Sequence, residues 1–165
     1  MSRIDFVTGA PEKYMPLVEE LSTISDRIES LVSGCTDREM QQTNSADSWS
    51  IARIMAHMLS YTRHNSEFIH QIAWMTDPQR RPWDEIAEVT DQDLVSKDGT
   101  ELSKVLRESI AKTVDLLSNT PDASWGRPGT VPGRGRRSLR QQLRNDINHL
   151  VEHIDQIEEL VGTLK

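Results

Sequence analysis

Residues 138–163, SLRQQLRNDINHLVEHIDQIEELVGT, carry the pattern that decides the fold. The apolar side chains of this stretch recur every three or four positions, at Leu139, Leu143, Ile147, Leu150, Val151, Ile154, Ile157 and Val161. That spacing is the period of an α-helix with one apolar face. Ser138 and Gln141 begin the stretch with a capping-box pattern, in which the two side chains satisfy free amides of the first turn. The sequence therefore predicts a long amphipathic helix over 138–163.

Three further stretches have the same period, and each has a boundary signal of its own. They predict helices over 11–33, 50–76 and 100–118. Ser50 can cap the second of these helices, and Asp98 with Glu101 forms another capping-box pattern before the third. No stretch alternates as a strand would, and residues 119–137 are rich in Gly and Pro, which predicts a loop. We therefore expect an all-α protein, a four-helix bundle that forms one domain over 1–165.

The segment between the second and third predicted helices is long enough for a crossover. Residues 77–99 number 23, which gives a reach of roughly 76 Å at about 3.3 Å per residue. A helix over 50–76 would be only about 40 Å long. The segment could thus run the length of the bundle and leave the second and third helices parallel, although its length does not require this.

The composition is that of a globular protein, and it argues against membrane and nucleic-acid-binding proteins. The chain has 165 residues, a formal charge of −7, 27% charged and 36% hydrophobic residues, as expected for a globular domain with its own core. It has no apolar run of membrane-spanning length and no apolar signal region, so we expect a cytoplasmic protein with no membrane partner. The single cysteine, Cys35, excludes an internal disulfide, and the acidic balance argues against nucleic acid as a partner.

One segment departs from the acidic balance. Residues 119–144 contain six Arg and one Asp, a local charge of +5 that leaves −12 on the rest of the chain. Arginines clustered beside Trp125 could contact nucleic acid or another anion. We favour the simpler interpretation, a solvated loop that balances an acidic body.

The histidines are the clearest candidates for chemistry. His149 and His153 are four residues apart and flank the apolar face of their predicted helix, and such pairs can share one metal ion. His57 lies on a flank of the 50–76 helix, so the three could meet near one end of the bundle. Three neutral imidazoles that leave coordination positions open are typical of a reactive site, because a structural zinc is normally closed by a fourth protein ligand. The pair alone is a weak signal, since scattered histidines also produce this spacing by chance.

The catalytic residues stay unassigned, with three pocket candidates. Tyr61 and His64 lie on the His57 flank and could exchange a proton nearby, although Tyr61 is more simply an amphipathic residue at the bundle edge. Gln156, one turn after the last histidine, could orient a ligand or a water. We expect His70 to be a surface residue, and we do not expect Cys35 to be a catalytic thiol, because no cationic group is implied beside it.

Two other metal motifs deserve comparison. His149–His153 matches the H-x-x-E-H pattern of inverted zinc proteases, but such an enzyme needs a further ligand downstream, and Glu152 points outward on the wheel. A di-metal carboxylate bundle needs Glu-x-x-His on two helices; Glu67-x-x-His70 fits, and Asp146-x-x-His149 fits in part. Glu67 and His70 fall off the core side of their helix, so both motifs remain minor alternatives.

Two segments together resemble a known family. Trp49–His57, WSIARIMAH, resembles the Trp-Ser/Thr…His opening of the second helix in DinB-like (DinB/YfiT-like) metalloenzymes, and His149–Ile157 resembles their terminal H-x-x-x-H segment with its Gln-Ile. The layout of helices is similar over nearly the whole chain. The family often has an acidic residue about one turn after the first histidine, where this chain has Tyr61 and Thr62.

The resemblance implies a four-helix bundle of up-down-down-up topology, commonly a homodimer. It also implies a divalent metal, nickel or zinc, bound by His57, His149 and His153. Characterised relatives include transferases and an isomerase that use bacillithiol, mycothiol or glutathione. Our leading hypothesis is therefore a metal-dependent transferase or isomerase that acts on a small-molecule substrate with a low-molecular-weight thiol. The alternatives are a metal-dependent hydrolase, or a non-enzymatic stress or interaction protein with a structural or vestigial metal site.

Overall fold

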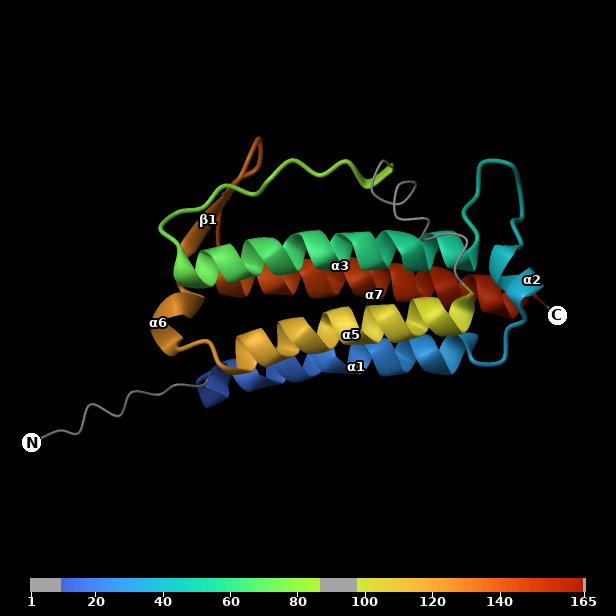
Figure 1. Cartoon of the computed structure of the whole chain (residues 1–165), viewed down its shortest axis with the longest axis horizontal. Helices are drawn as coiled ribbons and strands as arrows, with labels where there is room; N and C mark the ends of the chain where they lie inside the picture. Colours follow the sequence, from blue (N-terminus) through green and yellow to red (C-terminus); the bar gives the residue numbers. More distant parts are fainter. Residues whose placement is uncertain (1–9, 87–97, 165) are drawn as a thin grey trace, which may run out of the picture.

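The computed structural model describes residues 10–86 and 98–164, which form a bundle of long helices with a small two-stranded sheet beside one end (Figure 1). The long helices are α1 Met15–Val32, α3 Ile51–Trp74, α5 Gly99–Ser118 and α7 Leu139–Thr163. The short elements are η1 Glu12–Tyr14, α2 Asp37–Gln41, α6 Asp122–Trp125, β1 Pro128–Val131 and β2 Gly135–Ser138.

The capping signals read from the sequence mark the starts of three long helices. The Ser50 hydroxyl accepts an amide of the first turn of α3 at 3.0 Å. The Asp98 carboxylate accepts the Glu101 amide at 2.7 Å before α5. Ser138 and Gln141 form the reciprocal capping box of α7. These side chains satisfy amides that would otherwise lack partners, so each helix begins where local chemistry favours it.

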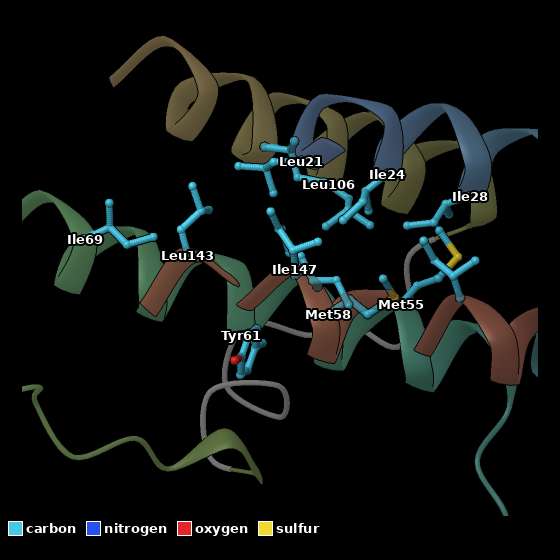
Figure 2. Close-up of a cluster of buried hydrophobic side chains, with 14 of the residues drawn as sticks. Leu21, Ile24, Ile28, Met55, Met58, Tyr61, Ile69, Leu106, Leu143 and Ile147 are labelled. Atoms are coloured by element: carbon cyan, nitrogen blue, oxygen red, sulfur yellow. The ribbon is translucent and has the colours of Figure 1, made fainter. Parts of the chain in front are cut away.

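Each long helix packs against two of the others. α1 and α3 both contact α5 and α7, so the four helices surround one apolar core (Figure 2). The core residues labelled there come from all four helices: Leu21, Ile24, Ile28, Met55, Met58, Tyr61, Ile69, Leu106, Leu143 and Ile147. The predicted helical bundle is thus confirmed.

The prediction that 119–137 is a loop without strands was wrong. This stretch contains α6, strand β1 and the start of β2, which pair antiparallel with Pro128 opposite Ser138 and Val131 opposite Gly135. Gly133 and Gly135 have φ values of 78° and 92°, a conformation that glycine adopts without steric cost. Strands of four residues with no apolar alternation give little periodic signal, which is why the hairpin was missed.

Trp125 does not contribute to an anion-binding surface, which corrects that alternative. Its ring is fully buried, stacks on Tyr14 with centroids 4.4 Å apart, and donates its Nε1–H to the Thr120 carbonyl at 3.0 Å. Neighbouring arginines have structural partners: Arg127 donates to a backbone carbonyl beyond the end of α3, and Arg144 pairs with a glutamate of α1. By stacking on Tyr14, the indole holds the chain just before α1 against α6.

The chain after α3 turns back along that helix. Arg80 donates to the Asn65 side chain at 3.5 Å, and Trp83 donates to the Ser60 hydroxyl at 3.0 Å. We call residues 77–86 the return segment; Figure 1 shows it running beside α3. Residues 87–97 of the predicted 77–99 crossover lie outside the described residues. Within the described residues, no helix combines the length and the apolar character needed to cross a bilayer.

Candidate metal centre

Three histidines meet between α3 and α7. The Nε2 atom of His149 lies 3.2 Å from Nε2 of His57 and 3.1 Å from Nε2 of His153. One ring nitrogen from each residue lies within 4.8 Å of the others, and no second such group of His, Cys, Asp or Glu occurs in residues 10–86 and 98–164. Two imidazole ligands about 2.0–2.1 Å from a tetrahedral ion would be about 3.3 Å apart. The observed nitrogen separations fit that requirement.

The outward nitrogens of two of these rings lie close to side-chain oxygens. Nδ1 of His57 lies 3.0 Å from Oε1 of Glu85, and the same oxygen accepts from Arg53 at 2.7 Å. Nδ1 of His153 lies 2.9 Å from Oε1 of Gln156. When each Nδ1 donates to its oxygen, the lone pair must lie on Nε2 and point into the cluster. Such partners fix both the tautomer and the orientation of metal-binding histidines.

Burial lowers the pKa values of two of the three histidines. Burial lowers the pKa of His57, and the Glu85 carboxylate only partly opposes that effect. Burial, with smaller contributions from His153 and His57, lowers the pKa of His149 to about 4. Burial alone would raise the pKa of Glu85, but hydrogen bonds from Arg53 and His57 lower it overall. At neutral pH His57 and His149 therefore offer imidazole lone pairs, and the ionised Glu85 carboxylate lies behind His57.

Tyr61 is buried beside the cluster, not at the bundle edge as its simpler interpretation suggested. Its ring centroid lies 4.1 Å from that of His149, and its hydroxyl donates to Oδ1 of Asp146 at 3.0 Å. The same Oδ1 accepts from Gln142 at 2.7 Å. Burial raises the pKa of Asp146 to about 7, although these hydrogen bonds work against the rise. Burial and the nearby Asp146 also raise the pKa of Tyr61, which remains a neutral phenol.

The structure rejects both minor metal motifs. Glu67 is exposed and pairs with Arg81 at 2.9 Å, and His70 is exposed as expected. Asp146 is hydrogen-bonded to Tyr61 within the bundle and is not in the group of potential ligands. The di-metal alternative is therefore wrong. The inverted-protease alternative fails as well, because Glu152 is exposed.

Aromatic rings enclose the His57 side of the centre. The ring centroids of Trp49 and Trp83 lie 5.3 and 5.7 Å from that of His57. His64 is buried and stacks on Trp83 at 5.6 Å, so it is a neighbour of the site and not one of the three converging histidines. Trp83 and Glu85 were not predicted as site residues. The return segment has no hydrophobic periodicity, so the sequence does not indicate which helix it contacts. The only sequence feature that bore on these two residues was the length of the 77–99 segment, which allowed it to run along the bundle.

A surface pocket of 520 Å³ adjoins the centre. His153 and Gln156 of α7 line one side, and Trp49, which precedes α3, lines the other. Small-molecule sites in proteins are typically about 300–1,000 Å³. One of the three converging histidines thus lines a hollow large enough for a small molecule.

Solved structures share this fold. YfiT from Bacillus subtilis, described as a probable metal-dependent hydrolase with an unusual four-helix bundle topology, has a TM-score of 0.83 and 19% identity, with 98% of this chain and 91% of that chain covered. YjoA, a DinB-like protein from Bacillus subtilis, has a TM-score of 0.65 and 13% identity, covering 89% and 90%. A mutant of the mycothiol-dependent maleylpyruvate isomerase has a TM-score of 0.69 and 10% identity, covering 89% of this chain but 65% of that chain.

The sequence itself identifies the family. Comparison with curated protein sequences gives no significant match. The sequence profile of the DinB superfamily, however, matches residues 20–157, which include all three converging histidines. With the profile covering most of the sequence, this chain belongs to the DinB superfamily.

Proposed function

We propose that this protein is a divalent-metal-dependent enzyme in which His57, His149 and His153 hold the ion. The convergence of three Nε2 atoms at 3.1 and 3.2 Å carries the proposal. Glu85 and Gln156 add support, because oxygens at 3.0 and 2.9 Å from the outward nitrogens favour inward-facing lone pairs. A set of three imidazole ligands leaves room in the coordination sphere for a substrate. Imidazole nitrogen suits nickel and zinc, which we propose as the metals.

We further propose that the co-substrate is a low-molecular-weight thiol and that the reaction is a group transfer or an isomerisation. When bound, the ion would act as a Lewis acid that lowers the pKa of a thiol, so that the thiolate is available at neutral pH. The protein's own part is to orient the rings through Glu85 and Gln156 and to shield one side of the site with Trp49 and Trp83. The fold shared with the mycothiol-dependent maleylpyruvate isomerase supports this choice.

Metal-dependent hydrolysis is the second candidate. It is favoured by the similarity in fold to YfiT, which is described as a probable metal-dependent hydrolase. The same Lewis acid would lower the pKa of water in place of a thiol. Turnover assays with and without an added thiol separate the two reactions, because only the transferase or isomerase requires one. Absence of turnover in both assays would favour the non-enzymatic alternative.

Metal analysis tests the proposed centre. We expect about one divalent ion per chain in protein purified without chelators, and we expect His153→Ala to lose most of it. His70→Ala is the matched control, since it removes an exposed histidine from α3 and should retain the metal. The proposal is wrong if the wild-type chain holds no metal and takes up neither nickel nor zinc when they are supplied.

We also propose the up-down-down-up order for α1, α3, α5 and α7. Contacts between helices support it. Ser66 of α3 meets Thr113 of α5 at similar distances from their helix starts. Pairing between α3 and α7 runs in opposite directions instead, because His57 meets His149 whereas the later Asn65 meets the earlier Gln142. The return segment supports it too, because it carries the chain back along α3 before α5 begins.

A further inference from the structure

The pocket beside the centre has a buried floor and an exposed rim. His153 lies at the floor and is 8% exposed, and the buried Ile54 lies beside it. Asp47 and Glu159 lie at the rim, and both are exposed. A ligand that reaches His153 therefore extends towards the exposed rim residues.

The lining of this pocket has one sign of charge. Asp47 and Glu159 contribute two carboxylates, and no Lys or Arg side chain from the described residues lines the pocket. The nearby Arg53 is already engaged, because its guanidinium lies 4.2 Å from the Trp49 ring centroid and donates to Glu85 at 2.7 Å. The rim consequently attracts a positive group and repels a negative one.

Apolar side chains form a further part of the pocket lining. Trp49 and Leu160 contribute apolar surface, and Trp49 is 40% exposed. Such surface favours a short carbon chain over a strongly hydrated group. The lining thus combines one of the three histidines, apolar surface and two carboxylates.

We infer that the pocket selects small amine-bearing ligands, with an electron-pair donor such as a thiol at the His153 end and a protonated amine between Asp47 and Glu159. The inference rests on the proposed function, since it assumes that the ligand's donor end meets a metal-loaded centre. It adds the charge of the substrate: ligands whose far end is anionic bind more weakly than cationic ligands of the same length.

Binding of three short thiols to the nickel-loaded protein tests this selectivity. Cysteamine is cationic at its far end, 2-mercaptoethanol is neutral and 3-mercaptopropionate is anionic. Dissociation constants come from titration of the thiolate-to-nickel charge-transfer absorbance at low salt. We expect Asp47→Asn with Glu159→Gln to lower the ratio of cysteamine affinity to 3-mercaptopropionate affinity by about tenfold, and added salt to shrink the difference. Differences in thiol acidity cancel, because each ligand is compared with itself in the two proteins.

A matched control removes two charges from elsewhere on α7. Asp155→Asn with Glu158→Gln changes the net charge equally, and neither residue lines this pocket. This control should leave the ratio unchanged. An equal ratio in the wild type and the rim variant overturns the inference but leaves a metal-dependent thiol enzyme intact.

A second ligand pair separates this inference from the proposed thiol chemistry. If the nickel-loaded protein binds none of the three thiols, the proposed co-substrate is wrong. Histamine and imidazole-4-acetate, followed through the nickel absorption spectrum, then measure the charge preference by themselves. Preference for histamine that is lost in the rim variant supports the inference, and equal binding overturns it. A chain that binds no metal overturns both proposals.

Discussion

Glu85 shows how much of the candidate centre depends on single side chains outside the three histidines. Its Oε1 joins Nδ1 of His57 to the Arg53 guanidinium, at 3.0 and 2.7 Å. A carboxylate at this position favours the ring orientation in which Nε2 of His57 faces the cluster. It also ties the return segment to the first two turns of α3.

Removing this carboxylate should weaken metal binding. We expect Glu85→Ala to lower the affinity for nickel or zinc by about 10–100-fold, because His57 loses the partner that orients it. Glu85→Gln should lower it less, since an amide oxygen can still accept from Nδ1. Competition with a chelator measures the affinities. Glu67→Ala, which breaks an exposed pair with Arg81, is the control, and equal affinities in the Glu67 and Glu85 variants would contradict the assignment.

Asp146 should make stability depend on pH. Its pKa is raised from 3.8 to about 7, so between these values the folded state holds a proton that the unfolded state has released. This contribution to stability is present below about pH 4 and is lost as the pH rises towards 7. Asp146→Asn removes the dependence and can still accept the Tyr61 hydrogen bond. The free energy of unfolding of the variant, relative to wild type, should therefore rise with pH by up to about 1.4 kcal/mol per unit.

Urea denaturation of the metal-free proteins at pH 5 and pH 8 measures this difference. The lowered pKa of His149 has the opposite effect on stability, which falls as pH decreases, but it is common to both proteins and cancels in the comparison. Asp155→Asn, an exposed position on the same helix, should show no trend. A variant whose stability difference from wild type is the same at both pH values would rule out a raised Asp146 pKa.

Which residues of the candidate site could be predicted from the sequence depends on whether their contacts lie within one helix or between separate segments. Helical spacing made His149 and His153 neighbours, and the flank of the second predicted helix suggested His57. Their convergence in the structure agrees with that reasoning, although their role as metal ligands remains a prediction. Glu85 and Trp83 could not be placed, because nothing periodic connects the return segment to α3. The burial of Asp146 could not be foreseen either, since it is a charged residue type whose partner Tyr61 comes from another helix.

At the scale of secondary-structure elements, the β1–β2 hairpin could not be predicted because it depends on contacts with a distant part of the chain. The long helices were predicted to within a few residues because each has apolar periodicity and, in three cases, a capping side chain. The hairpin is held instead by tertiary contact. A Cβ atom at Gly129 would lie 2.7 Å from atoms of both Phe68 and Ile72, so the strand packs on α3 at a distance that only glycine allows.

Gly129→Ala should therefore destabilise the protein. The added methyl group must displace two buried side chains or lift β1 from α3, and overpacking of this kind typically costs about 1–3 kcal/mol. Chemical denaturation measures the loss. Gly126→Ala is the matched control, because a Cβ atom there meets nothing within 4 Å. If the two alanine variants are equally stable, the hairpin does not pack on α3 as described.

At the scale of the whole molecule, the proposed helix order predicts which pairs of introduced cysteines can form a disulfide. Ser66 and Thr113 are hydrogen-bonded between α3 and α5. With Cys35 replaced by serine, we expect Ser66→Cys with Thr113→Cys to form a disulfide under mild oxidation, detected by mass spectrometry after proteolysis. Ser66→Cys with Ser103→Cys should remain reduced, because Ser103 lies near the opposite end of α5. If only the second variant forms a disulfide, α5 runs in the opposite direction and the proposed order is wrong.

The two indoles beside His57 give the centre an optical reporter of its own. Trp49 and Trp83 have ring centroids 5.3 and 5.7 Å from the His57 ring, whereas Trp125 is buried against Tyr14 and Trp74 is largely exposed. A paramagnetic ion such as nickel held by His57 would quench the emission of the first two tryptophans more than that of the others. Occupancy of the centre could then be followed by intrinsic fluorescence, without a label, in every variant that keeps both indoles.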